Sequence, residues 1–220
     1  LIGLKNLYML VSKAHVEDFY KRPITRKSEI LKHREGLIIG SACEAGDLYD
    51  AIVRGQSDEE LIEIARFYDY LEIQPLGNNE FMVRKSAEPE KINKKTGEPI
   101  VNIHKHVTSL EVIMDMNRKV VQIADKLGLP VVATGDVHFA AKEDVILRKI
   151  LMAAQGYEDF DNQAPLYLKT TNEMLSDFAY FGERAKEFVI DNPNKIADMV
   201  SDEVIPVPKG NYPPVIEGSD

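Results

Sequence analysis

The stretch "VVATGDVHFA", residues 131–140, is the clearest indication of how this chain folds. Its first four residues are apolar or small, which is typical of a strand that is covered on both faces. Gly135 then allows the backbone to turn, and Asp136 and His138 follow the turn. A buried strand therefore ends in two side chains that often bind metal ions, and the rest of the sequence must show which groups could join them.

Two earlier stretches also have the pattern of strands, and helical patterns separate all three. Residues 36–43, "GLIIGSAC", form a short apolar run bounded by glycines, and residues 68–75, "YDYLEIQP", form a second run that a proline closes. Helical patterns follow the first run, over residues 44–55, and precede the third, over residues 110–128. This alternation predicts an α/β fold in which helices cover a buried parallel sheet.

Local signals predict where several helices begin and end. Ser57 with Glu60, and Thr108 with Glu111, have the spacing of a capping box, so each pair predicts the start of a helix. Gly128 predicts the end of the second of these helices, because glycine readily adopts the left-handed conformation found after a helix. The chain also opens with an amphipathic pattern of about four helical turns.

Residues 77–107 are polar, rich in lysine and interrupted by prolines and glycine. This composition predicts an excursion outside the core, with a hairpin across "KKTGEP", residues 94–99. Three helical patterns follow the third strand, and in the last of them Pro193 is either a break or a first-turn proline. They cover residues 142–156, 170–178 and 183–200.

The composition excludes several classes of protein. The chain has 220 residues, 44% of them hydrophobic, and a formal net charge of −9. An acidic chain has no overall basic surface, so direct binding of duplex DNA by these residues alone is disfavoured. With one cysteine and no apolar run long enough to span a bilayer, we expect a reducing, cytoplasmic setting without a membrane. The start at Leu1, without methionine, suggests a fragment of a longer protein.

Four side chains at or near predicted strand ends are candidates for chemistry, because sites of parallel α/β proteins assemble there. On an extended segment Asp136 and His138 would point the same way, so a carboxylate and an imidazole could share a metal ion. Cys43 and Glu72 could face the same site. Alternative interpretations stay open: a capping Asp136, a hydrogen-bonded His138, a Cys43 that is a small buried hydrophobe, and a Glu72 that is simply exposed.

Other possible sites are excluded. His104 and His106 have a spacing that can chelate a metal, but they lie in the polar excursion and away from any predicted strand end, so a solvated loop is the better interpretation. The sequence contains no GxGxxG, no Walker loop, no GxSxG and no paired CxxC. The most common nucleotide-binding, hydrolase and zinc-finger classes are therefore excluded.

Seven stretches together, in their order along the chain, resemble one family. They are "GLKNLYMLVSKAH", "REGLIIGSAC", "FYDYLEIQP", "GLPVVATGDVHF", "RKILMAAQG", "TTNEMLSDFAYFG" and "VIDNPNKIADMV". The family is the PHP (polymerase and histidinol phosphatase) domain of PolC-type DNA polymerase III alpha subunits. The resemblance covers nearly the whole chain, and only residues 77–107 depart from it, because they are longer than the family leads us to expect.

The resemblance implies part of a distorted (β/α)7 barrel with parallel strands, covering helices and a metal cluster at the carboxyl ends of the strands. It implies that a 3′-5′ exonuclease is inserted in the domain, that residues 1–200 are the portion after this insertion, and that residues 201–220 form a linker towards the polymerase core. Asp136 and His138 match the last metal motif of the family, and Cys43 matches another ligand. The early His-x-His motif has no counterpart here, and the catalytic aspartates of the polymerase would lie beyond residue 220.

Three functional hypotheses follow from the resemblance. In the first, the chain is a fragment of a replicative DNA polymerase, without catalytic residues of its own, whose partners are the remaining polymerase chain, DNA and replisome subunits. In the second, the domain is a metal-dependent phosphoesterase or pyrophosphatase. In the third, it is a scaffold. The complete domain would hold a divalent transition metal, zinc or manganese, and this segment would hold it partly or not at all. Open strand edges would favour self-association.

Overall fold

The computed structural model describes residues 1–89, 91–93, 95–157, 159–207, 209–211, 213 and 218. It divides into two compact units, one of Leu1–Ile38 with Asp198–Asp220 and one of Ile39–Ala197. No helix among the described residues is both long enough and apolar enough to cross a membrane.

The first unit contains helices α1, Ile2–Val16, and α2, Lys27–Lys32. The opening helix is therefore confirmed. Glu29 of α2 joins the two helices through an ion pair with Lys13 of α1 at 3.0 Å, and it also pairs with Lys32 of its own helix at 2.6 Å. The predicted linker, residues 201–220, lies only partly among the described residues, and those that are described form no helix or strand.

The second unit is built on the two parallel strands β1, Leu71–Ile73, and β4, Val131–Ala133, with Leu71 opposite Val131. Two of the predicted strands and the parallel α/β class are thus confirmed, whereas a full barrel is not. The predicted strand over residues 36–43 is largely wrong, since it is reduced to one parallel bridge between Gly40 and Tyr70. Ala42 prevents the strand from continuing to Cys43, because its φ of 61° lies outside the extended region.

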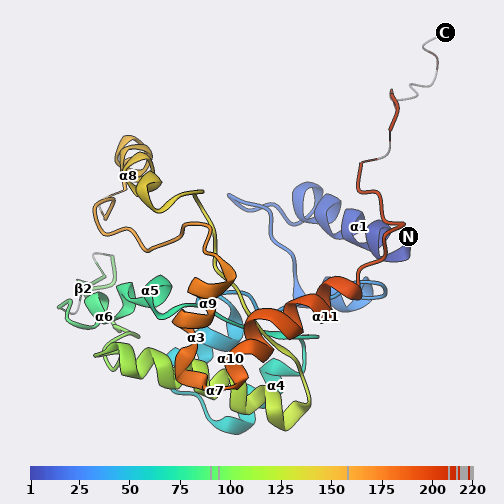
Figure 1. Ribbon diagram of the computed structural model, residues 1–220. Coiled ribbons are helices and arrows are strands. Elements are labelled where there is room, and N and C mark those ends of the chain that lie inside the picture. The colour runs from blue at the N-terminus through green and yellow to red at the C-terminus, as the bar shows by residue number, and fades with distance from the viewer. Residues whose placement is uncertain are drawn as a thin grey trace. The chain divides into compact units, whose positions relative to one another are not determined.

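Helices α3, Asp47–Val53, α4, Asp58–Ala65, and α7, Leu110–Leu127, pack against one another, and α7 also contacts β1 (Figure 1). The capping box of Ser57 and Glu60 is confirmed. The other capping box is wrong by one residue, because Ser109 caps α7 by accepting a hydrogen bond from the amide of Val112. Gly128 ends α7 in the left-handed conformation, as predicted.

The segment of residues 77–107 is more structured than predicted. It forms helices α5, Leu76–Asn79, and α6, Phe81–Ser86, and the predicted hairpin is confirmed by the antiparallel strands β2, Lys91–Ile92, and β3, Pro99–Ile100. The expectation that it lies outside the core is wrong at Met82 and Val107, which are 1% and 0% exposed. Met82 belongs to the short apolar run of residues 81–83 and Val107 stands alone between polar neighbours, and neither forms part of a longer periodic pattern.

The three helical patterns after β4 are confirmed. In the last of them, the five residues before Asn192 form a π-helical segment. Pro193, which has no amide hydrogen to donate, is the second residue of the following helix and lies in its first turn. The elements of this region are η1, Lys142–Asp144, α8, Val145–Ala154, α9, Thr171–Asp177, η2, Ala179–Phe181, α10, Arg184–Lys186, η3, Glu187–Asp191, and α11, Asn192–Asp198.

The sheet edge at β4 is covered. All three residues of β4 are buried, η3 packs against the strand, and the side-chain amide of Asn192 donates a hydrogen bond to the carbonyl of Val131 at 2.8 Å. The edge of the sheet at β4 is therefore not open, because a helix of the same chain covers it.

Candidate metal site

Asp136 and His138 lie side by side after β4. The carboxylate oxygen Oδ1 of Asp136 is 3.7 Å from Nδ1 of His138. The predicted proximity is therefore found, but its expected cause is wrong: Asp136 has a φ of 51°, so the segment is a turn and not an extended strand. The side chains meet because the backbone reverses locally.

Hydrogen bonds fix the orientation of the His138 ring. Its Nδ1 donates to the backbone carbonyl of Asp136 at 2.8 Å, which leaves the lone pair on Nε2 for another partner. The backbone amide of His138 donates to the carbonyl of Leu166 at 2.8 Å, and Phe139 forms a parallel bridge with Tyr167. The segment around residue 167 therefore holds the imidazole in place.

Glu72 is attached to the loop that carries Cys43. Its Oε1 accepts a hydrogen bond from the amide of Ala42 at 3.1 Å, and its own amide donates to the hydroxyl of Ser41 at 2.9 Å. Gly40 makes this approach possible, because a Cβ atom there would lie 2.5 Å from Oε1 of Glu72. Of the open alternatives for Glu72, an unconstrained exposed acid is thus wrong.

Cys43 itself is partly exposed. Burial is the main cause that raises the pKa of its thiol, and the neighbouring carboxylate of Glu44 adds to the shift. Among the residues that the structure describes, Ala42, directly before Cys43, and Asp136 are two of the three non-glycine residues with positive φ. Such backbone conformations concentrate at functional sites, so the two loops share a feature that is independent of their side chains.

The structure does not join these two loops into one metal cluster. Within the described part of the chain, no three or more His, Cys, Asp or Glu side chains lie close enough to hold a metal ion together. The donors that are present, a carboxylate and an imidazole, fit a transition metal in type, but a structural zinc site needs four ligands. Asp136 and His138 by themselves would supply two of these ligands.

Sequence reasoning missed a group of buried oxygen atoms at the ends of the same strands. Asn78 and Asn79 follow β1, Thr134 follows β4, and each has a buried side-chain oxygen without a hydrogen-bond partner. The Nδ2 of Asn78 donates to the carbonyl of Gly135 at 3.0 Å, which connects the two loops. The signal was available, because two asparagines follow directly after a strand that a proline closes.

A second buried polar group supports the sheet from α7. Asn117, which is 0% exposed, donates to the carbonyl of Gln74 at 3.0 Å and to the hydroxyl of Tyr180 at 2.8 Å, and it accepts from the hydroxyl of Tyr49 at 3.3 Å. Burial raises the pKa of Tyr180 to about 12, so this phenol stays protonated at neutral pH. This group holds the strand end in place and has no ionised member.

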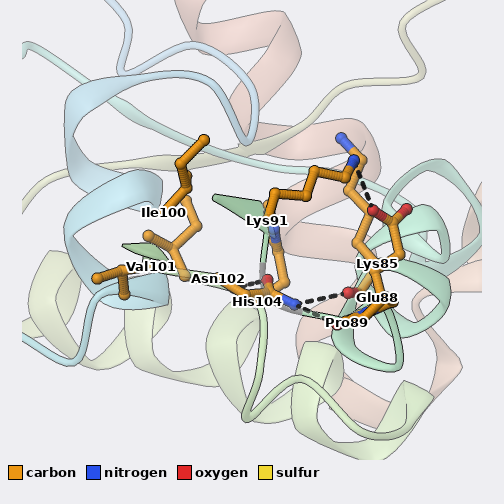
Figure 2. A pocket seen from close by; sticks show the side chains of 9 residues that line it. Lys85, Glu88, Pro89, Lys91, Ile100, Val101, Asn102 and His104 are labelled. Atoms are coloured by element: carbon orange, nitrogen blue, oxygen red, sulfur yellow. Dashed lines mark hydrogen bonds and ion pairs between the residues drawn. The ribbon is translucent and has the colours of Figure 1, made fainter. Parts of the chain in front are cut away.

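His104 lies in a pocket between α6 and the β2–β3 hairpin, and Figure 2 shows its neighbours there. The ring meets Phe81 edge-on at 6.1 Å between centroids, and burial is the main cause that lowers its pKa. Asn102 closes the pocket by donating to the carbonyl of Lys85 at 2.8 Å. These contacts account for His104 without a metal ion.

Comparison with known proteins first defines the class of the chain. Residues 2–75 match the family model of the PHP domain. Over 99% of its length the chain is similar to proteins named DNA polymerase III PolC-type. It is 50% identical over 219 residues to the protein of Clostridium perfringens, 44% over 221 to that of Thermotoga maritima, and 39% over 228 to that of Bacillus subtilis. The chain spans 14% of the length of each. The resemblance seen in the sequence is confirmed: the chain is similar over nearly its whole length to one segment of these polymerases.

Proposed function

We propose that this chain is part of the PHP domain of a bacterial replicative DNA polymerase, and that the whole polypeptide transfers deoxynucleotides to a primer. The observation that carries the proposal is the 50% identity to a PolC-type polymerase over 99% of the chain. DNA and the other replisome subunits are then partners of the whole polymerase. Because it would act on the chromosome of a bacterium, we place it in the cytoplasm.

Within this polymerase, we infer that Asp136, His138 and Cys43 contribute ligands to a divalent transition metal, zinc or manganese. Support comes from the 3.7 Å approach of Asp136 to His138, from the free Nε2 of His138, and from the positive φ values beside Cys43 and at Asp136. A bound metal would polarise a phosphate ester or hold the domain together. The described residues do not complete the site, so its other ligands would come from the rest of the polypeptide.

The incomplete ligand set favours a structural role for this segment over hydrolysis. Hydrolysis by metal-activated water needs a metal held firmly by several protein ligands with one open position. Among the described residues, Asp136 lies beside His138, and no group of three or more potential ligands is found. A phosphoesterase or pyrophosphatase activity remains the alternative if the whole polymerase completes the cluster.

Two assays on the intact polymerase test these proposals. Primer extension tests the polymerase assignment: extension by the whole protein, and none by residues 1–220 alone, is the expected result. Template-dependent extension by residues 1–220 would contradict it. Elemental analysis tests the ligands: Asp136→Ala and His138→Ala should lower the metal content, whereas the matched control His104→Ala should not. A loss of metal in the control alone would place the site elsewhere.

A further inference from the structure

Helix α8 exposes the apolar face that a surface helix usually buries. Its large apolar side chains Ile146, Leu147, Ile150 and Leu151 are 57%, 57%, 60% and 62% exposed, and the helix has no buried residue. They recur at i and i+4, so they form one continuous face. Surface helices normally bury such a face against their own core. In Figure 1, α8 stands apart from the helices that surround the sheet.

The side of α8 that contacts its own chain carries two basic residues, together with the partly buried Val145 and Met152. Nε of Arg148 donates to Oε1 of Gln163 at 2.7 Å, and Nζ of Lys149 lies 3.8 Å from a carboxylate oxygen of Asp161. These two basic residues are half-buried, while the leucines and isoleucines beside them are exposed. The helix is therefore held from its charged side, and its apolar face is left outward.

The outward face continues into a groove beside the candidate metal site. Leu147, Leu151 and Met152 of α8 line this groove together with His138 and Phe139, and its volume is about 320 Å³. A partner seated on α8 would thus also lie next to the imidazole of His138. The face and the candidate ligand belong to one surface.

The size of this face limits what can cover it. The four exposed side chains of this 10-residue helix offer only part of the roughly 800 Å² of accessible surface per partner that a stable complex between separate chains buries. A second copy of the chain could not be held by so small a surface. A segment of the same polypeptide could, because tethering gives it a high effective concentration.

We propose that the apolar face of α8 docks against an apolar surface elsewhere in the same polymerase polypeptide, outside these 220 residues. The proposal rests on the proposed function, since the chain spans only 14% of its polymerase relatives and most of such a polypeptide lies outside it. It adds to that function a specific contact surface, Ile146, Leu147, Ile150 and Leu151. The partner surface covers these four side chains and closes the groove next to His138.

Photo-crosslinking in the full-length polymerase tests this docking. Ile150 is replaced by p-benzoylphenylalanine, and Glu63 of α4, whose side chain is 84% exposed, carries the same group as the matched control. We expect the probe at position 150 to form a crosslink within one polypeptide, to residues outside the 220-residue segment, at a yield that does not change on dilution. The control should form no such crosslink.

The contrary outcomes are distinct. A crosslinked species of twice the mass, which disappears on dilution, would overturn the proposal in favour of a second copy. A crosslink only to residues within the segment, or a yield equal to the control, would overturn it as well. If the position 150 variant is insoluble, Leu151→Cys replaces it, and maleimide should label this cysteine about tenfold more slowly than Glu63→Cys in the same full-length protein. Equal labelling rates would overturn the proposal.

Primer extension by the unmodified polymerase separates the two proposals. A protein that forms the intrachain crosslink but does not extend primers would contradict the proposed function and leave the contact of α8 in place. A protein that extends primers without the crosslink would contradict the docking alone.

Discussion

Helices α7 and α8 have the same kind of sequence pattern and opposite fates. Ile113, Val120 and Ile123 of α7 are at most 1% exposed, whereas its charged residue Asp115 faces outward. In α8 the apolar residues are the exposed ones. The periodic pattern of a sequence thus predicts that a helix has an apolar face. It does not predict which part of the protein packs against that face.

The largest expected difference between the two helices is in the cost of removing one apolar side chain. Ile123→Ala in α7 should lower the free energy of unfolding by about 2–5 kcal/mol, because it leaves a cavity in the core. Ile150→Ala in α8 should change it by less than about 0.5 kcal/mol in the 220-residue chain, because the side chain is already 60% exposed. Chemical denaturation of both variants measures the two free energies of unfolding. Equal losses would contradict the different packing of α7 and α8.

The second-largest loss of stability is expected at a buried polar residue of α7. Asn117→Ala should lower the free energy of unfolding by about 1–3 kcal/mol, because the carbonyl of Gln74 and two tyrosine hydroxyls lose a buried partner. The matched control is Asp115→Ala, on the exposed side of the same helix. If the two variants unfold at the same denaturant concentration, the buried hydrogen bonds contribute nothing and the account of α7 is wrong.

The start of α7 allows a sharper test, because sequence and structure disagree there by one residue. Ser109→Ala should lower the free energy of unfolding by about 1 kcal/mol, since Ser109 is the residue that caps the helix. Thr108→Ala should have a smaller effect. Thermal unfolding of the two variants shows which residue caps the helix. A larger loss of stability for Thr108→Ala would support the capping box predicted from the sequence.

The smallest effect concerns an acid that joins α7 to α4. Lys126 and Lys119 of α7 hold the pKa of Asp58 below its usual value of 3.8. A lowered pKa in the folded state means that the stabilisation is present above pH 3.8 and is lost as the pH falls below it. Asp58→Asn should therefore destabilise the chain at pH 7 and much less at pH 3. Denaturation curves at both pH values test this, and a difference that persists at pH 3 would contradict the ion pairs as its cause.

The features that sequence predicted correctly depend on neighbouring residues. The strand at Val131–Ala133, the capping box at Ser57 and the helix end at Gly128 need only a local pattern, and all three are present. For the site, the nearness of Asp136 and His138 was predicted, but the φ of 51° at Asp136 that produces it was not. A local motif therefore indicates which side chains form a site but does not predict the backbone conformation that brings them together.

The features that sequence missed depend on contacts between distant segments. Asn78 is fixed by the carbonyl of Gly135, and Glu72 by the amide of Ala42, and neither contact leaves a periodic trace in the sequence. Self-association was predicted from an open strand edge, but Asn192 and its helix cover β4. The self-association of the 220-residue chain itself stays a prediction.

Hydrogen exchange tests most directly the claim that the face of α8 is an interface inside a larger polymerase. The amides of α7 and α8 are followed by mass spectrometry in the 220-residue chain and in the full-length polymerase, with α7 as the internal reference. The account predicts that α8 exchanges about tenfold or more slowly in the full-length protein, while α7 is unchanged. Equal exchange of α8 in both proteins would contradict it.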